Sequence, residues 1–132
     1  AFRALSPQTR IFGVQSSAAP SYHLSHREGK VVNTDTAETF ADGVATRCPS
    51  EYTLELISEH VEDIVLVSDE EIEDAIRLAW RTTHNLAEGA GAIALGAVSK
   101  LRSRFQGGRV AAIFSGGNLD TSTVGRIFTS RG

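Results

Sequence analysis

A serine and two glycines follow an apolar run near the end of the chain, in the tetrapeptide Ser115-Gly116-Gly117-Asn118. The preceding residues, Val110–Phe114, are all apolar, as in a parallel strand that is buried on both faces. Ligand sites of parallel sheets lie beyond the carboxyl ends of the strands. The glycines let a ligand approach the main chain, and a serine hydroxyl can donate or accept a hydrogen bond. The pattern therefore predicts a ligand-binding turn, and a glycine-rich turn without a ligand fits the spacing equally well.

Two further segments of small residues could line a site, namely Glu88–Ala92 and Ala41–Gly43. Glycine and alanine at the start of a helix allow close packing against a sheet or a bound ring. Glu88 is also favourable there without any ligand, because a carboxylate complements the helix dipole. Taken alone, the second segment is predicted to be a plain turn in which Gly43 takes a positive φ.

Spacing excludes several common kinds of site. No Gly-Lys-Ser/Thr follows a glycine-rich loop, and Gly13 and Gly43 lack the glycine partners of a dinucleotide-binding motif. The histidines are His23, His26, His60 and His84. They do not have the spacing of zinc ligands, so we expect no zinc site. Cys48 is predicted to be a small structural residue rather than a nucleophile.

Composition indicates one soluble globular domain. The chain has 132 residues, of which 41% are hydrophobic and 22% charged. Its formal net charge of -3 argues against a general nucleic-acid binder, which needs a basic surface. No apolar run approaches the roughly 20 residues that span a bilayer. A single cysteine forms no internal disulfide, which favours a reducing cytoplasm.

Alternating strand and helix patterns must position these segments. Strands are predicted at Arg10–Gln15, Lys30–Val32, Ile64–Val67 and Val110–Phe114. Helices are predicted at Ala1–Leu5, Ala18–Arg27, from Ser50 to His60, after Ser68, at Ala90–Phe105 and at Thr121–Phe128. This alternation indicates an α/β fold with a mostly parallel sheet and flanking helices.

The most specific local pattern begins at Ser68. The sequence Ser68-Asp69-Glu70-Glu71 follows the apolar run Ile64–Val67 directly and predicts a capping box. The helix that it starts should bury one stripe, made of Ile72, Ala75, Ile76 and Ala79. The helix that follows Ser50 offers four side chains for burial, which are Tyr52, Leu54, Leu56 and Ile57.

In order, these segments resemble the C-terminal half of a threonine/serine dehydratase of the fold-type II pyridoxal-phosphate class. The resemblance rests on Ile11–Gln15, Ala41–Ala45, Val67–Ile72, Ala87–Ala92 and Ser115–Asp120. It implies the second half of the large domain of a tryptophan synthase β-like enzyme. Residues 1–132 would be the C-terminal part of that cofactor-binding domain, without its N-terminal half and its small domain. The absence of methionine and the uncapped run Ala1–Leu5 agree with an excised chain.

The resemblance also implies roles for individual residues toward pyridoxal 5'-phosphate. Ser115 matches the serine that hydrogen-bonds to the pyridine nitrogen. Because a hydroxyl has little tendency to protonate that nitrogen, the ring is a weaker electron sink, and the carbanion at Cα loses its β-hydroxyl quickly. Gly43 matches a glycine of the cofactor pocket, and Glu88 the acid beside ring and substrate. Gly116 and Asn118 would belong to the turn that fixes Ser115.

Other family residues have no counterpart here. The Schiff-base lysine and the phosphate-binding loop of the family would lie upstream of this chain, and Lys30 and Lys100 match neither. The resemblance therefore implies no catalytic residue in this chain, which would be inactive alone. Where some relatives bind a divalent cation, this sequence has Gln15 and Ser21, so we expect no metal site.

For the intact enzyme, the resemblance implies β-elimination of water from threonine or serine and deamination to a 2-oxo acid and ammonia. A racemase or a dehydratase of another hydroxy amino acid remains open within the same family. From a different class, a non-catalytic α/β module that binds a metabolite or a partner also remains open. The expected partners are the missing N-terminal portion, a small hydroxy amino acid and further copies in a homo-oligomer, with no nucleic acid and no membrane. The expected location is cytoplasmic.

Overall fold

Two parallel strands form the centre of the computed structural model, which describes residues 2–129. Strand β1 (Phe12–Ser16) pairs with β2 (Asp63–Val67) so that Ser16 lies opposite Val67. Ile64 and Val67 are buried, as predicted for a strand that is covered on both faces. The parallel pairing brings the carboxyl ends of both strands to one edge of the sheet, where ligand sites of such sheets lie.

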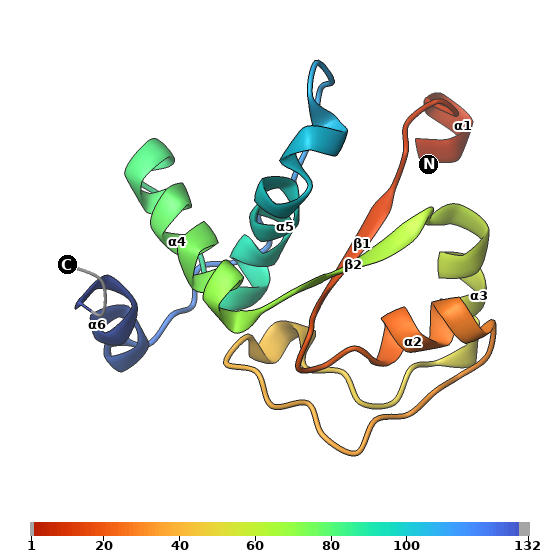
Figure 1. The fold of residues 1–132 in the computed structure, drawn as a ribbon, viewed down its shortest axis with the longest axis horizontal. Helices are drawn as coiled ribbons and strands as arrows, with labels where there is room; N and C mark the ends of the chain where they lie inside the picture. The colour runs from red at the N-terminus through yellow and green to blue at the C-terminus, as the bar shows by residue number, and fades with distance from the viewer. Residues whose placement is uncertain (1, 130–132) are drawn as a thin grey trace.

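Helices cover both sides of this sheet (Figure 1). Helices α2 (Ser21–Glu28) and α3 (Glu51–His60) lie on one side, and α4 (Asp69–Thr83) and α5 (Gly89–Lys100) on the other. Helix α6 (Thr121–Thr129) packs on α4. The arrangement confirms the predicted α/β fold with a parallel sheet and flanking helices.

Three shorter helical segments complete the chain. They are α1 (Phe2–Leu5) and the 3-10 turns η1 (Asp42–Val44) and η2 (Arg102–Phe105). The turn η2 replaces the last part of the single helix that was predicted over Ala90–Phe105. There the Arg104 N–H donates to the Leu101 carbonyl at 2.8 Å, which tightens the chain. Within residues 2–129, no helix has the length and apolar character needed to cross a bilayer.

The core lies where α4 packs on α5 and α5 packs on the sheet. The stripe predicted for α4 is buried, with exposed fractions of 0–2% at Ile72, Ala75, Ile76 and Ala79. On α5, a Cβ added at Gly96 would lie 3.0 Å from Val67 Cγ1, so a small residue is needed for this close approach. Ile127 of α6 is fully buried and extends the same core.

The predicted capping box starts α4 directly after β2. The Glu71 N–H donates to Ser68 Oγ at 3.3 Å, and the Ser68 N–H donates to a Glu71 carboxylate oxygen at 2.8 Å. These two bonds satisfy backbone donors that the first turn of a helix leaves free. The end of β2 and the start of α4 are therefore fixed relative to each other.

Two of the predicted strands are wrong. Residues Val110–Phe114 have no regular secondary structure and pair with no strand in the part of the chain described, and Ile113 is 74% exposed. A buried parallel strand needs a neighbouring strand and cover on both faces, and residues 2–129 provide neither at this segment. Lys30–Val32 is also irregular, because Val32 donates its N–H to Ser25 Oγ at 2.8 Å instead of to a neighbouring strand.

Two helix predictions need smaller corrections. Helix α2 begins at Ser21, with Pro20 at its N-cap, rather than at Ala18. Of the four residues offered for burial in α3, only Leu54 is buried, whereas Tyr52 is 71% exposed. Helix α3 packs mainly on α2 and not on the sheet, so it buries a narrow face.

Candidate functional site

Glu88 joins the turn at residues 115–118 to the start of α5. Its backbone N–H donates to the Gly116 carbonyl at 3.1 Å, and its carboxylate accepts the Asn118 N–H at 3.2 Å. The Ser115 hydroxyl donates to the Ala90 carbonyl oxygen at 3.4 Å. Four of the five residues that were predicted to contact the cofactor thus lie together at the N-terminal end of α5.

Close backbone packing explains why this turn contains glycines. A Cβ added at Gly91 would lie 2.3 Å from the Gly116 carbonyl oxygen, and one at Gly116 would lie 2.4 Å from Glu88 Oε1. A Cβ at Gly117 would lie 2.6 Å from the Leu86 carbonyl oxygen. A larger residue at Gly91 of α5 or at Gly117 of the turn would meet backbone and force the two segments apart, whereas one at Gly116 would meet the end of the Glu88 side chain, which can move aside.

Gly43, the fifth predicted residue, reaches the same helix from the loop that contains η1. A Cβ at Gly43 would lie 2.8 Å from Ala90 Cβ, and one at Gly89 would lie 2.7 Å from Ala41 Cβ. The prediction of a positive φ at Gly43 is wrong, because only Gly29 and Gly107 have this conformation among the described glycines. Contact with α5 is what requires a glycine here.

The assembled residues are open to solvent on one side. Ser115, Asn118 and Gly43 are exposed, and Gly116 and Glu88 are half-buried. A ligand therefore has access to the serine hydroxyl and to bare main chain, with a carboxylate at the edge of the cluster. This combination can hold a flat polar ligand against the start of α5.

Asp120 follows the turn and fixes the beginning of α6. Hydrogen bonds from the Ser122 hydroxyl and from Thr123 hold the pKa of this carboxyl well below its usual range. The Thr123 N–H donates to Asp120 Oδ1 at 2.8 Å. The ionised carboxylate therefore accepts a backbone donor of the first turn of α6. This bond anchors the chain on the far side of the turn from α5.

Neither lysine lies at this cluster. Lys100 is the last residue of α5, roughly 16 Å along the helix axis from Gly89. Its ammonium group is paired at 2.9 Å with a Glu71 carboxylate oxygen. Lys30 follows α2, where its backbone N–H donates to the Ser25 carbonyl at 3.3 Å.

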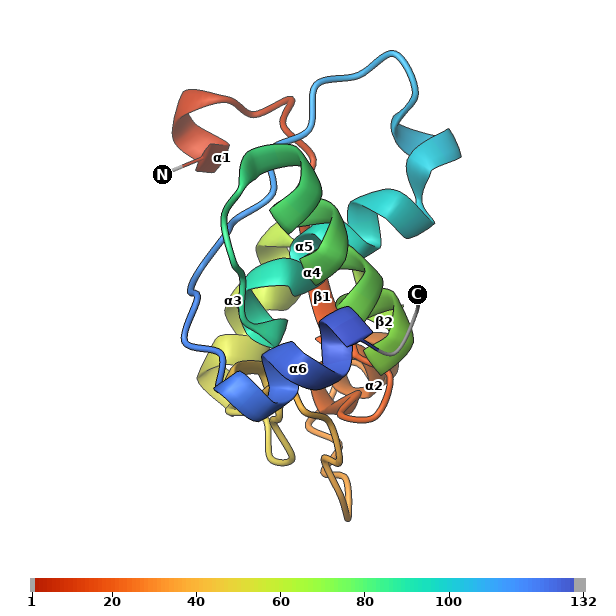
Figure 2. The ribbon, with the colours of Figure 1, turned by 90° about the vertical axis from the view of Figure 1, so that its left-hand side faces the viewer.

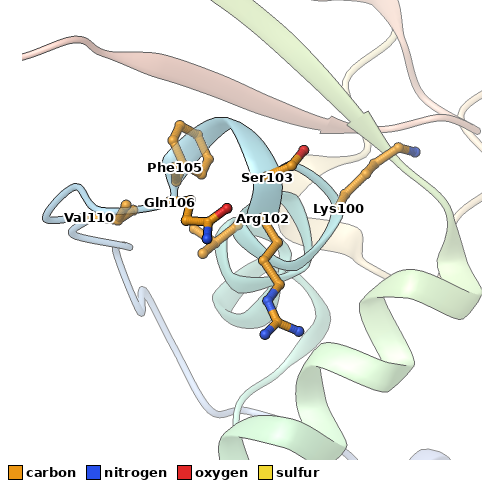
Figure 3. A pocket seen from close by; sticks show the side chains of 7 residues that line it. Lys100, Arg102, Ser103, Phe105, Gln106 and Val110 are labelled. Carbon is orange, nitrogen blue, oxygen red and sulfur yellow. The ribbon is translucent and has the colours of Figure 1, made fainter.

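A separate cavity of about 670 Å³ lies at the other end of α5 (Figure 3). It is lined by Val98, Lys100, Arg102, Ser103, Phe105, Gln106 and Val110. It contains none of the five predicted site residues. The segment after it returns along one side of the molecule to α6 (Figure 2). The hydrogen bond to the Ala90 carbonyl places Ser115 of this segment at the start of α5.

Gln15 and Ser21, which the resemblance matched to the cation-binding positions of some relatives, form hydrogen bonds within the chain. The Gln15 side-chain oxygen accepts the His23 N–H at 2.8 Å, and the Ser21 hydroxyl donates to the Thr46 carbonyl at 2.6 Å. In the described part of the sequence, no group of three or more His, Cys, Asp or Glu residues could hold a metal ion.

Sequence reasoning gave no role to Thr39 or to the side chain of Asp69. The Thr39 hydroxyl donates to Asp69 Oδ1 at 2.6 Å and thereby ties the Gly43 loop to the start of α4. The two residues are 30 positions apart, and Thr39 lies in a loop without periodicity. No signal in a single sequence would have paired them.

Comparison with known proteins assigns the chain to a family. Residues 1–116 match the family described as pyridoxal-phosphate dependent enzyme. The chain belongs to this family. It is 40% identical over 124 residues to the L-threonine ammonia-lyase of Geobacter sulfurreducens, a match that covers 94% of this chain and 31% of that protein. It is 33% identical over 120 residues to the serine racemase of Schizosaccharomyces pombe, covering 91% of this chain and 37% of the racemase.

Comparison with a solved structure supports the same family assignment. The processed form of threonine deaminase isoform 2 from Solanum lycopersicum superimposes with a TM-score of 0.91 at 32% identity, over 99% of this chain and 37% of that one. The predicted resemblance to fold-type II pyridoxal-phosphate enzymes is confirmed, and with it the cofactor of the family. The chain spans about a third of the length of these relatives.

Proposed function

We propose that residues 1–132 are the C-terminal part of the cofactor-binding domain of a pyridoxal-phosphate-dependent threonine or serine ammonia-lyase. The observation that carries the proposal is the cluster at the start of α5, where three separate segments bring Ser115, Glu88 and Gly43 together. The likeness to the threonine ammonia-lyase of Geobacter sulfurreducens supports the choice of substrate class.

The cluster fits one edge of a pyridine ring. The Ser115 hydroxyl is exposed, and its 3.4 Å contact with the Ala90 carbonyl is longer than the usual range for a hydroxyl donor, so it can turn to a ligand. Gly43 and Gly116 present main chain without a side chain, which suits a flat ring. Ser115, Gly116, Gly43, Glu88 and Asn118 are accordingly the residues proposed to hold the cofactor.

The residues of the cluster would have different roles toward the cofactor. When bound, pyridoxal phosphate supplies the electron sink for removal of the α-proton of an amino acid. The neutral Ser115 hydroxyl would hydrogen-bond to the ring nitrogen without protonating it. The Glu88 carboxylate is held by the Asn118 N–H at 3.2 Å, which keeps it at the edge of the cluster beside the turn.

The remaining parts of the enzyme would come from outside residues 1–132. We infer that the lysine that carries the cofactor and the loop that binds its phosphate lie in that other part. The exposed apolar segment Val110–Phe114 would pair with one of its strands and become buried, since its sequence is that of a covered parallel strand. The chain alone would be inactive. The intact protein is proposed to be a cytoplasmic homo-oligomer.

The similarity to the Schizosaccharomyces pombe racemase supports a second candidate activity, inversion of serine. The two activities differ in products, because elimination releases ammonia and a 2-oxo acid, whereas racemisation releases only the opposite enantiomer. The assay is incubation of the full-length protein with threonine or serine, followed by measurement of all three products.

The full-length protein should show the absorbance band of bound pyridoxal phosphate, and borohydride should remove that band. Absence of the band would contradict both activities and favour a non-catalytic module. Ser115→Ala should lower the rate of 2-oxo acid formation about fivefold or more, since one lost hydrogen bond costs about 1 kcal/mol. Ser103→Ala, which removes an exposed hydroxyl at the separate cavity, is the control. A Ser115→Ala rate within twofold of this control would refute the role of the hydroxyl.

A further inference from the structure

Asp69, the first residue of α4, binds two other elements through both of its carboxylate oxygens. Oδ1 accepts the Thr39 hydroxyl at 2.6 Å and the Ser16 hydroxyl at 3.3 Å. Oδ2 accepts the Phe40 backbone N–H at 3.3 Å. One side chain thus joins the end of β1 to the loop that leads into η1.

The support beneath Asp69 is rigid. The capping box fixes the neighbouring Ser68 and Glu71 at the junction of β2 and α4. Hydrogen bonds to an ionised acceptor are stronger than those between neutral groups. The loop after α2 has no regular structure before η1, so the bonds to Thr39 and Phe40 fix it just before the residues that enter the pocket.

The attachment continues from Asp69 to the start of α5. Thr39 Oγ1, the group that donates to Asp69, accepts the Ala41 N–H at 3.2 Å. Ala41 is only 2% exposed and packs so closely on Gly89 that a Cβ there would lie 2.7 Å away. Gly43 follows within the same turn and meets Ala90. A path of direct contacts therefore runs from Asp69 to the proposed pocket.

A second contact holds the same loop from α6. The guanidinium group of Arg126 lies 5.3 Å from the centre of the Phe40 ring, and Arg126 is also paired with Glu73 of α4. Phe40 is thus held by its backbone at Asp69 and by its ring at Arg126. The two attachments fix both the position and the orientation of the loop.

We propose that Asp69 is a positioning residue for the cofactor pocket, which holds Thr39 and Phe40 so that Gly43 is already placed against α5 before a ligand binds. Without this attachment, cofactor binding would have to order the loop, and the entropy lost would weaken affinity. The role rests on the proposed function, because the pocket is the one assigned there to pyridoxal phosphate.

Thr39→Val and Asp69→Asn in the full-length protein test this role. Thr39→Val removes one hydroxyl at nearly constant volume, and Asp69→Asn weakens the acceptor. Thr39→Ser, which keeps the hydroxyl, should restore wild-type behaviour. Thr34→Val is the matched control, because the Thr34 hydroxyl lies in the same loop but donates to the Thr36 carbonyl at 2.9 Å.

Two measurements are made on each variant. The first is hydrogen exchange at the amides of residues 40–44 in the cofactor-free protein, and the second is the dissociation constant of pyridoxal phosphate. Thr39→Val and Asp69→Asn should speed the exchange and weaken cofactor binding about tenfold, as expected for loss of a hydrogen bond to a charged group. Thr39→Ser and Thr34→Val should remain within twofold of the wild type.

The outcomes separate the two proposals. If the wild type binds the cofactor and Thr39→Val matches it in both measurements, the role of Asp69 is overturned and the proposed function stands. An equal effect of Thr34→Val would overturn that role as well, since any change in the loop would then suffice. A wild-type protein that binds no pyridoxal phosphate would overturn the proposed function and the pocket role together. Thr39→Val keeps the test decisive if Asp69→Asn fails to fold.

Discussion

Replacement of Gly91 by alanine tests the packing that places Ser115. The added Cβ would lie 2.3 Å from the Gly116 carbonyl oxygen and 3.1 Å from the Gly116 nitrogen. Contacts of a Cβ below 3.0 Å are essentially never observed, so the turn and α5 must separate by at least about 0.7 Å. The turn carries Ser115, and this separation would move the hydroxyl away from its place beside Ala90.

Two opposing terms determine the stability of Gly91→Ala. Alanine favours a helix interior by about 1 kcal/mol relative to glycine. Overpacking costs about 1–3 kcal/mol. The net change in the free energy of unfolding should therefore stay below about 2 kcal/mol, and the protein should still fold. The effect on function should be larger, because a misplacement of about 1 Å at a reacting site can lower a rate about 100-fold.

The assay compares Gly91→Ala with Gly125→Ala in the full-length protein. Gly125 lies within α6, and a Cβ there meets nothing within 4 Å, so alanine should stabilise the helix by about 0.5–1 kcal/mol without touching the site. We expect Gly91→Ala to bind pyridoxal phosphate more weakly and to form 2-oxo acid at least about tenfold more slowly. Cofactor affinity and rate that stay within twofold of Gly125→Ala would refute the inferred packing of the turn on α5.

Two further predictions concern stability. Ile76→Ala should lower the free energy of unfolding by about 2–5 kcal/mol in denaturant titration, because Ile76 of α4 is fully buried in the core. The control Tyr52→Ala should change it by less than about 0.5 kcal/mol, because Tyr52 is exposed. Hydrogen bonds from the Ser122 hydroxyl and from Thr123 lower the pKa of Asp120. The ionised Asp120 should therefore stabilise α6 fully at pH values above its unfolded-state pKa of about 3.9. This stabilisation should be lost as the pH falls through the lowered pKa of the folded state. NMR titration of the α6 amides should show that acid transition in the wild type but not in Asp120→Asn, and an ordinary Asp120 pKa would contradict the capping role.

Local signals predicted the region around α4 well. The apolar run of β2, the capping box at Ser68 and the stripe that contains Ile72 and Ile76 each depend on neighbours within a few residues. A short stretch of sequence contains all the residues that form such a pattern, since helix caps and helical faces are set by residues three or four positions apart. The strand predicted at Val110–Phe114 from its apolar run is wrong, because a parallel strand depends on partner strands that residues 2–129 do not supply.

In the candidate site, too, the sequence predicted some features and could not reveal the contacts between distant segments. The resemblance selected Ser115, Glu88 and Gly43, and the structure brings them together, although their role toward a cofactor stays a prediction. Spacing could not reveal why these positions need small residues, because the reason at Gly43 is its approach to Ala90 across the chain. Contacts of this kind link segments without any shared periodicity.

The order of contacts at the sheet edge shows how the fold positions the residues proposed to hold the cofactor. The parallel register brings the ends of β1 and β2 together, so that Ser16 and Asp69 meet. Asp69 in turn holds Thr39, and the following residues reach α5 at Gly89. A shift of α4 relative to α5 would therefore act on the Gly43 loop, which is bonded to α4 through Asp69 and packs on α5 at Gly89 and Ala90. The Ser115 turn is bound to α5 through Glu88. The position of the Gly43 loop relative to the Ser115 turn therefore depends on how α4 packs on α5.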